Sequence, residues 1–386
     1  KLSPNHERLI ADGGQMGAYN GWERANWFAK DGDDTSEAAT ETWSRQGPWT
    51  QRVKQEVEAC RDAVGVLDMP GFSRYTLTGE GSAEWLRNQI AGALPKAGRM
   101  NLGYFADSRG RIVTEVTIIH WGEDDFWLMT AAVAQWHDFE FLTKSLPDDG
   151  SLTLIDITKQ WSTHLVTGPK SRDLIAQLAP EADLSTGWLS TQDATISGKS
   201  VKLFRISFAG ELGWEIHTSF EDSADVYTSI RDAGATPFGM YALDSMRIEK
   251  GYRTWKGDLS TDYTLFEGGV ERFVRLNKEQ DFPGKAALQA EKQQGAKKGF
   301  VTLVVEAGDS DAPFMSTIWH GDEVVGETTS GNWGYRVNKS IALGVVKAEL
   351  AAPGTELEVE IFGTRCKAIV QEDMPLWDPE NERIRA

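Results

Sequence analysis

The pattern of apolar and polar positions divides the chain into an alternating α/β part and a later part made of strands. From about residue 46 to 285, strands alternate with helices, as in the β-branched run IVTEVTIIHW at 112–121, its partner DDFWLMTAA, and a helical segment at 132–146. A second series follows, in which KSVKLFRISFAG and GWEIHTS predict a hairpin and SADVYTSIRDAG predicts a helix that ends at Gly234. Because the strand–strand–helix order occurs twice at similar spacing, we expect two related halves.

The two ends of the chain differ from this middle part. Residues 1–45 are polar and mixed, and we expect an arm that packs through Trp22, Trp27 and Phe28. From residue 298 onward, short strands and turns predict a small barrel with almost no helix. We therefore divide the chain into an N-terminal arm (1–45), an α+β core of two subdomains (46–290) and a β-barrel domain (298–386).

Composition and charge narrow the class of protein. The 386 residues carry a formal net charge of −18 without an acidic tail or basic block, which argues against nucleic acid or an anionic membrane as the main partner. No run of 18 apolar residues occurs. Two distant cysteines, Cys60 and Cys366, are typical of reduced thiols, so we expect a cytoplasmic protein. The chain starts at Lys1, which leaves two interpretations open: a subunit without its initiator Met, or a piece of a longer protein.

Sequence motifs for common cofactors are missing, and acidic residues on strands remain. The six histidines have no metal-ligand spacing, and there is no phosphate-binding loop, dinucleotide fingerprint or serine elbow. In the stretch GWEIH, Trp214 and Ile216 share one face of a strand, so Glu215 and His217 share the other. The two open interpretations are an exposed strand face and a ligand site beside glycines that admit a ring.

Two further stretches raise the same question. Glu115 lies within the apolar run RIVTEVTII, so it faces either solvent or a polar cavity. The segment YALDSMRIEKGYRTWKGDL predicts a helix that ends near Gly251, with Asp244 and Arg247 three residues apart. Ordinary surface pairing would explain that spacing equally well.

Together these stretches resemble the family of glycine-cleavage T-proteins (aminomethyltransferases), and most of all the folate-binding half of dimethylglycine and sarcosine dehydrogenases. The resemblance runs in order from about residue 4 to the C-terminus, and the flavin-binding half of those dehydrogenases has no counterpart in it. The matching segments are GWERANWF, DSRGRIVTEVTI, TGPKSRDLI, RISFAGELGWEIH, YALDSMRIEKGYRTWKGDL, DFPGKAAL, TTSGNWGYRVNKSIALGVV and DPENERIR.

The resemblance implies an α+β, three-domain T-protein-like ring, in which two related α+β core domains and a C-terminal β-barrel surround a central channel for tetrahydrofolate. It implies that the Glu215 carboxylate accepts the adjacent N–H and amino donors of the pterin ring. Glu115 would be the catalytic group, stabilising an iminium cation or managing a proton. The residues implied to border the folate are Glu115, Val116, Thr117, Phe208, Glu215, Ile216 and His217, with Arg247, Trp255 and Arg272 as wall or tail contacts.

Two positions depart from the family pattern. Glu115 stands where T-proteins usually have aspartate, so its reach is one methylene longer, and Phe208 lacks the hydroxyl of the tyrosine often found there. We expect a tetrahydrofolate-dependent demethylase or one-carbon transferase that acts on a small N-methylated amine of the dimethylglycine or sarcosine type. The alternatives are a demethylase of another small donor, of the dimethylsulfoniopropionate or trimethylamine N-oxide type, and a non-catalytic folate-binding module. The expected partners are a small methyl donor and a flavin- or metal-containing demethylating domain or subunit, with no metal in this chain.

Overall fold

The N-terminal residues form a hairpin flanked by helices. The structure is a computed structural model that describes residues 1–40 and 42–386. Trp22, Trp27 and Phe28 are all buried, which confirms that they anchor this segment. The elements here are α1 (His6–Ala11), β1 (Gly14–Tyr19), β2 (Trp22–Phe28), α2 (Glu37–Thr40), α3 (Pro48–Asp62) and β3 (Gly65–Asp68).

The first core sheet has five strands in the order β5-β6-β7-β4-β8. Tyr75, Ile118 and Leu128 fill the core on one face, where the helices α4 and α5 pack. The elements are β4 (Phe72–Thr78), α4 (Ser82–Gln89), β5 (Arg99–Ala106), β6 (Ile112–Gly122), β7 (Asp125–Ala131), η1 (Ala132–Ala134), α5 (Gln135–Ser145), β8 (Thr153–Asp156) and η2 (Thr158–Gln160).

The second core sheet has six strands in the order β10-β11-β12-β9-β3-β13. Strand β11 ends at Phe204, several residues before the predicted strand does, because residues 206–208 turn to line a cavity. The elements are β9 (Trp161–Thr167), α6 (Ser171–Leu178), β10 (Thr191–Ile196), β11 (Lys199–Phe204), β12 (Gly213–Ser219), α7 (Ser223–Asp232) and β13 (Thr236–Pro237).

The two sheets share one topology. Each is built as strand, helix, three strands, helix, strand, and β4 to β8 take the same places in the first sheet as β9, β10 to β12 and β13 take in the second. Strand β3, from earlier in the chain, is inserted beside β9 in the second sheet only. The prediction of two related halves is therefore confirmed in topology.

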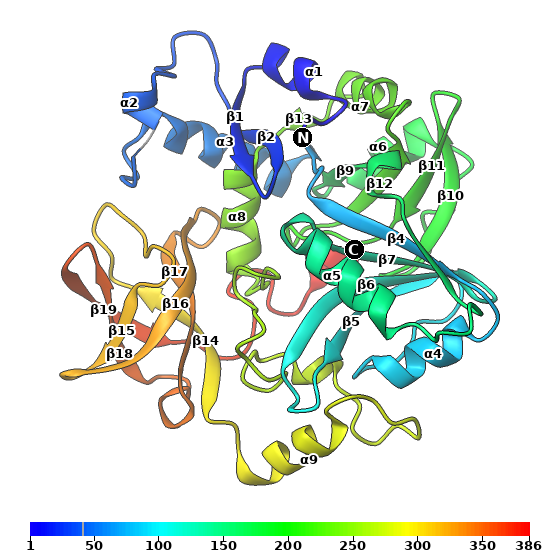
Figure 1. Cartoon of the computed structure of the whole chain (residues 1–386). Coiled ribbons are helices and arrows are strands. Elements are labelled where there is room, and N and C mark those ends of the chain that lie inside the picture. Colours follow the sequence, from blue (N-terminus) through cyan, green and yellow to red (C-terminus); the bar gives the residue numbers. More distant parts are fainter. Residues whose placement is uncertain (41) are drawn as a thin grey trace.

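Helix α8 (Met240–Glu249) stands between the barrel and the two sheets (Figure 1). Most of its residues are buried, because it packs against α3, β2 and β16 at once. No helix in the described ranges is both long and apolar enough to cross a membrane. The segment that follows α8 contains η3 (Glu271–Phe273) and α9 (Lys285–Gln294).

The C-terminal strands close into a six-stranded barrel in the order β14-β17-β16-β15-β18-β19, as the sequence predicted. The α+β class and the barrel are thus confirmed, whereas the exact domain limits at 45/46 and 290/298 stay predictions. The barrel elements and the last helix are β14 (Lys298–Val305), β15 (Thr317–His320), β16 (Glu323–Gly334), β17 (Lys339–Lys347), η4 (Ala348–Leu350), β18 (Glu356–Ile361), β19 (Thr364–Val370) and α10 (Glu382–Arg385).

A buried ionic cluster fastens the barrel to the core. Arg336 donates to Glu249 on α8 and, at 2.8 Å, to Glu211 just before β12. Arg383 donates to the second oxygen of Glu211 at 2.6 Å. Because Glu211 and Glu249 are almost fully buried, each carboxylate depends on these guanidinium partners. The cluster holds four separate segments of the chain together around Glu211 and Arg336.

Candidate functional site

A cavity of about 1210 Å³ lies where the two sheets, α8 and the barrel meet. It is larger than the roughly 300–1,000 Å³ of common small-molecule sites, so it has room for a two-ring ligand with a tail and a small second reactant. Its wall includes Arg24, Glu115, Thr117, Phe208, Glu215, Asp244, Arg247, Tyr252, Arg253, Trp255 and Arg272.

Glu215 reaches this cavity from the middle of β12. Trp214 and Ile216 point into the core of the second sheet, so the strand alternation sends Glu215 to the other side. Gly213 lies so close to β9 that a Cβ there would come within 2.9 Å of Val166 O. Only 6% of Glu215 is exposed, which excludes the interpretation of an exposed strand face.

The surroundings of Glu215 bring the pKa of its carboxyl group close to neutral pH. Burial raises the pKa of its carboxyl to about 7, although the nearby Arg74 guanidinium acts in the opposite direction. His217 Nε2 lies 3.2 Å from Glu215 Oε2, and burial lowers the pKa of His217 well below its usual value. The imidazole is therefore neutral, and the pair is a hydrogen bond between a neutral ring and a carboxylate that still has acceptor capacity toward the cavity.

Glu115 lines the same cavity from β6. Tyr104, its direct neighbour on β5, donates its hydroxyl to Glu115 Oε2 at 2.6 Å. Burial raises the pKa of Glu115 to about 7, while the Tyr104 hydrogen bond and Arg253 oppose that rise. A carboxyl group with a pKa near neutrality can release or take up a proton, and its anion can stabilise a developing cation.

The two carboxylates occupy non-equivalent strands of the duplicated topology. Glu115 lies on β6, whose counterpart is β11, whereas Glu215 lies on β12, the counterpart of β7. They are therefore not copies of one ancestral position, and two different roles are consistent with their separate origins.

The three expected wall contacts on and after α8 are Arg247, Trp255 and Arg272, and all three line the cavity. Arg247 is 6% exposed and donates to Asp258 at 2.8 Å and to Ser330 on the barrel at 3.2 Å. It is thus an interdomain brace on the cavity wall rather than an ordinary surface residue. Trp255 is also buried, and Arg272 lies over the ring of Phe273 at 4.9 Å. Both of these face the cavity.

Strand alternation separates the other expected contacts. Thr117 and Phe208 line the cavity, and Phe208 stacks on Tyr252 with ring centroids 5.5 Å apart. By contrast, the side chains of Val116 and Ile216 pack in the cores of the two sheets, so the structure does not bring them to the cavity wall. His217 is fully buried behind Glu215 and reaches the cavity through that carboxylate.

Sequence reasoning missed several residues of this site. Tyr104 comes near Glu115 only through the register of the first sheet, and Arg74 comes near Glu215 only because the two sheets pack together. Arg253 had a signal in the sequence, because it lies two residues before Trp255 in a segment already singled out.

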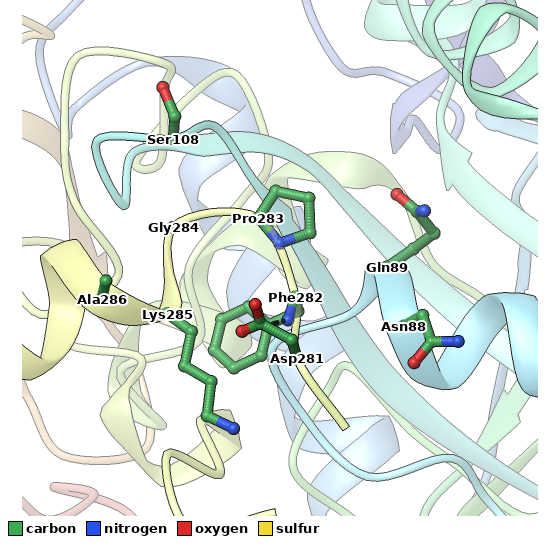
Figure 2. Close-up of a pocket in the computed structure, with 9 residues that line it drawn as sticks. All are labelled: Asn88, Gln89, Ser108, Asp281, Phe282, Pro283, Gly284, Lys285 and Ala286. Carbon is green, nitrogen blue, oxygen red and sulfur yellow. Dashed lines mark hydrogen bonds between the residues drawn. The ribbon is translucent and has the colours of Figure 1, made fainter. Parts of the chain in front are cut away.

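A second, shallower cavity of about 450 Å³ lies apart from the carboxylates, at the turn before α9 (Figure 2). Gly284 adopts φ +87° there, and a Cβ would come within 2.4 Å of Asp107 O. The ammonium group of Lys285 donates to the Lys278 and Gln280 carbonyls, and the Phe282 N–H donates to Asp281. The polar groups of this turn are thus largely satisfied by the chain itself, as in a structural turn.

Fold and site together define a multidomain α+β protein with two buried carboxylates in one ligand-sized cavity. The GCVT N-terminal domain matches residues 5–278, and the glycine cleavage T-protein C-terminal barrel domain matches residues 298–378. The chain therefore belongs to the glycine-cleavage T-protein family. Members of this family bind tetrahydrofolate, and most are tetrahydrofolate-dependent enzymes.

Individual relatives agree with this assignment. Dimethylglycine dehydrogenase, mitochondrial, of Rattus norvegicus is 34% identical over 379 residues, which cover 96% of this chain and 44% of that protein. An aminomethyltransferase of Bacillus cereus is 29% identical over 326 residues, which cover 82% of this chain and 88% of that protein. The chain thus spans about half the length of the dehydrogenases it matches.

The solved structure of the glycine cleavage system aminomethyltransferase T from Bartonella henselae has the same fold. It superimposes with a TM-score of 0.85 at 20% identity and covers 98% of both chains. At this identity the likeness supports the architecture alone.

Proposed function

We propose that this chain is a tetrahydrofolate-dependent demethylase or one-carbon transferase. It would move a methyl or formaldehyde unit from a small N-methylated amine, of the dimethylglycine or sarcosine type, to tetrahydrofolate. The observation that carries the proposal is that Glu115 and Glu215, both with a pKa near 7, face one large cavity in a protein of this family.

The residues present fit a reduced folate. A pterin ring offers a ring N–H beside an amino group, and a carboxylate can accept both hydrogen bonds at once. Glu215 supplies that carboxylate at the inner wall. The folate tail carries carboxylates of its own, and Arg253 and Arg272 lie on the same cavity wall to pair with them.

Glu115 is the proposed catalytic group. Its longer reach, compared with an aspartate, is fixed by the Tyr104 hydroxyl, so the carboxyl group has one defined position. Two outcomes differ in what Glu115 does. For a formaldehyde unit, the Glu115 carboxyl group would donate a proton to the hydroxyl that leaves the N5 adduct as water, and its carboxylate would stabilise the iminium cation that remains. The carboxylate would then take up the N10 proton as N10 attacks the iminium carbon and closes the ring, which yields 5,10-methylenetetrahydrofolate. For a methyl group moved intact, the carboxylate would stabilise the cationic donor while the methyl carbon bonds to N5 of tetrahydrofolate and the demethylated amine leaves. It would then take up the N5 proton, and the product is 5-methyltetrahydrofolate.

The oxidation that would release formaldehyde from an amine requires an electron acceptor, so the proposal includes a flavin- or metal-containing demethylating domain or subunit as a partner. The similarity to dimethylglycine dehydrogenase over about half of that protein supports this arrangement. A cytoplasmic location stays a prediction from the two free cysteines.

Mass spectrometry of the folate product tests the proposal. The purified chain is incubated under anaerobic conditions with tetrahydrofolate and, in turn, formaldehyde, dimethylglycine, sarcosine, glycine betaine, trimethylamine N-oxide and dimethylsulfoniopropionate. Formation of 5,10-methylenetetrahydrofolate from formaldehyde faster than in protein-free buffer, with loss of that excess in Glu115→Gln, supports transfer chemistry. Tight folate binding with no product above the protein-free rate for any donor would instead identify a folate-binding module.

A further inference from the structure

Four buried side chains form a continuous hydrogen-bonded chain from the first sheet to the cavity. Arg74 on β4 donates its Nη2–H to Thr163 Oγ1 on β9, and that oxygen lies 3.1 Å from His217 Nδ1. His217 Nε2 then lies 3.2 Å from Glu215 Oε2. The first three residues are at most 1% exposed, so water does not compete for these hydrogen bonds.

The direction of each hydrogen bond follows from the donors available. A guanidinium group has donors only, so Thr163 Oγ1 accepts from Arg74. The single hydroxyl hydrogen of Thr163 is then free to be donated to His217 Nδ1, which accepts it with its lone pair. The ring proton of a neutral imidazole must therefore be on Nε2, from where it is donated to Glu215.

The Nδ1–H tautomer of His217 would create two unfavourable contacts between buried polar groups. With the proton on Nδ1, the Nε2 lone pair of His217 would face the Glu215 carboxylate. The Thr163 hydroxyl hydrogen would lose its acceptor as well, and an unsatisfied buried polar group is costly. That arrangement becomes acceptable for the His217–Glu215 pair only if Glu215 is protonated. This series of hydrogen bonds therefore favours the ionised form of Glu215.

The surroundings of His217 keep its ring neutral. Burial, Arg74, His164 on β9 and Lys202 on β11 all lower the pKa of His217. Lys202 is itself paired with Asp193 at 2.8 Å. Arg74 is also the charged group that counters the effect of burial on the pKa of Glu215. His217 therefore stays neutral, and only its tautomer remains to be set.

We propose that Arg74 and Thr163 are positioning residues that hold His217 in its Nε2–H tautomer, and so keep the Glu215 carboxylate oriented and ionised for a ligand with two adjacent N–H donors. The ligand part of this inference rests on the proposed function, since the aminopyrimidinone edge of tetrahydrofolate has those donors. The tautomer part concerns the ligand-free protein alone.

Thr163 offers the sharpest test, because its neighbours include a matched control. Thr163→Val removes the hydroxyl at nearly constant shape, and Thr163→Ser restores it. Thr218→Val is the control, because Thr218 is a fully buried threonine on β12 whose hydroxyl has no hydrogen-bond partner among the described residues. Two readouts are needed: the 15N shifts of the His217 imidazole without ligand, assigned by their loss in His217→Gln, and the tetrahydrofolate dissociation constant against pH.

The wild type, Thr163→Ser and Thr218→Val should show the Nε2–H tautomer, and Thr163→Val a mixture with the Nδ1–H form. Tetrahydrofolate affinity should fall about tenfold or more in Thr163→Val alone, with its pH dependence displaced toward higher pH. An Nδ1–H tautomer in the wild type overturns the inference even if Thr163→Val does not fold, as does a Thr163→Val protein identical to Thr218→Val in both readouts. A wild type that has the Nε2–H tautomer but does not bind tetrahydrofolate would refute the proposed function and leave the tautomer assignment standing.

Discussion

Replacing Glu215 by glutamine should weaken folate binding and stabilise the ligand-free protein at the same time. Glutamine keeps the shape of glutamate but has one acceptor oxygen and a donor amide. Because His217 Nε2 donates to this side chain, the amide oxygen of Glu215→Gln turns toward His217. Its NH2 group then faces the cavity, where the proposed pterin donors would meet another donor.

The expected loss of affinity follows from those unpaired donors. Removing the charged acceptor of buried hydrogen bonds costs roughly 2–5 kcal/mol, which is about a 30-fold to several-thousand-fold rise of the dissociation constant. Glu215→Ala should lose a similar amount. The loss should come without unfolding, since Trp214 and Ile216 hold β12 from its other face.

The effect on stability has the opposite sign. Burial raises the pKa of the folded carboxyl from 4.5 to about 7, so between these pH values the folded protein keeps a proton that the unfolded chain has released. The free energy of unfolding therefore falls as pH rises through this window, by up to about 3 kcal/mol above pH 7. Glu215→Gln removes this penalty, so its melting temperature should exceed that of the wild type at pH 8 by a few degrees and approach it near pH 4.5.

Calorimetric titration with tetrahydrofolate and thermal melts at pH 4.5 and 8 measure both effects. Weak binding with a higher melting temperature at pH 8 supports the account. Equal affinity of wild type and Glu215→Gln would refute the role of Glu215 in ligand binding, and a lower melting temperature at pH 8 would refute the argument from burial.

Three further predictions concern neighbouring groups. Glu115→Gln should slow turnover by ~100- to 10,000-fold and leave the tetrahydrofolate dissociation constant within a few-fold, as single-turnover rates and calorimetry would show. Tyr104→Phe removes a hydrogen bond that lowers the pKa of Glu115, so the acidic limb of the pH–rate profile should move to higher pH; an unmoved limb would contradict the contact. Glu211→Ala leaves the buried Arg336 without one of its partners, so thermal melts should show a free energy of unfolding lower by roughly 3–5 kcal/mol. Unlike Glu215→Ala, it should leave the folate affinity unchanged.

Much of this architecture was readable from local patterns. The duplicated strand–strand–helix order, the barrel and the anchoring role of Trp22, Trp27 and Phe28 all follow from periodicity and residue type. The insertion of β3 into the second sheet could not be predicted, because β3 pairs with β9, a strand about 100 residues later in the chain, and no local pattern indicates that pairing.

The candidate site shows the same division. The alternation of side chains in GWEIH correctly separates Glu215 from Trp214 and Ile216. The same alternation, applied to both strands, would have removed Ile216 and, on β6, Val116 from the expected contacts. The partners of the carboxylates could not be predicted. Arg74 lies 141 residues before Glu215, and only the packing of the two sheets brings it near.

The most direct test of the central claim is calorimetric titration of tetrahydrofolate, kept reduced, into the ligand-free wild-type chain at pH 8, with Glu211→Gln and Glu215→Gln in parallel. These two carboxylates lie four residues apart, and the structure places one in an interdomain ion pair and the other on the cavity wall. The account predicts one tetrahydrofolate per chain for the wild type and for folded Glu211→Gln, and strongly weakened binding for Glu215→Gln. No heat of binding to the wild type, or equal binding by all three proteins, would contradict it.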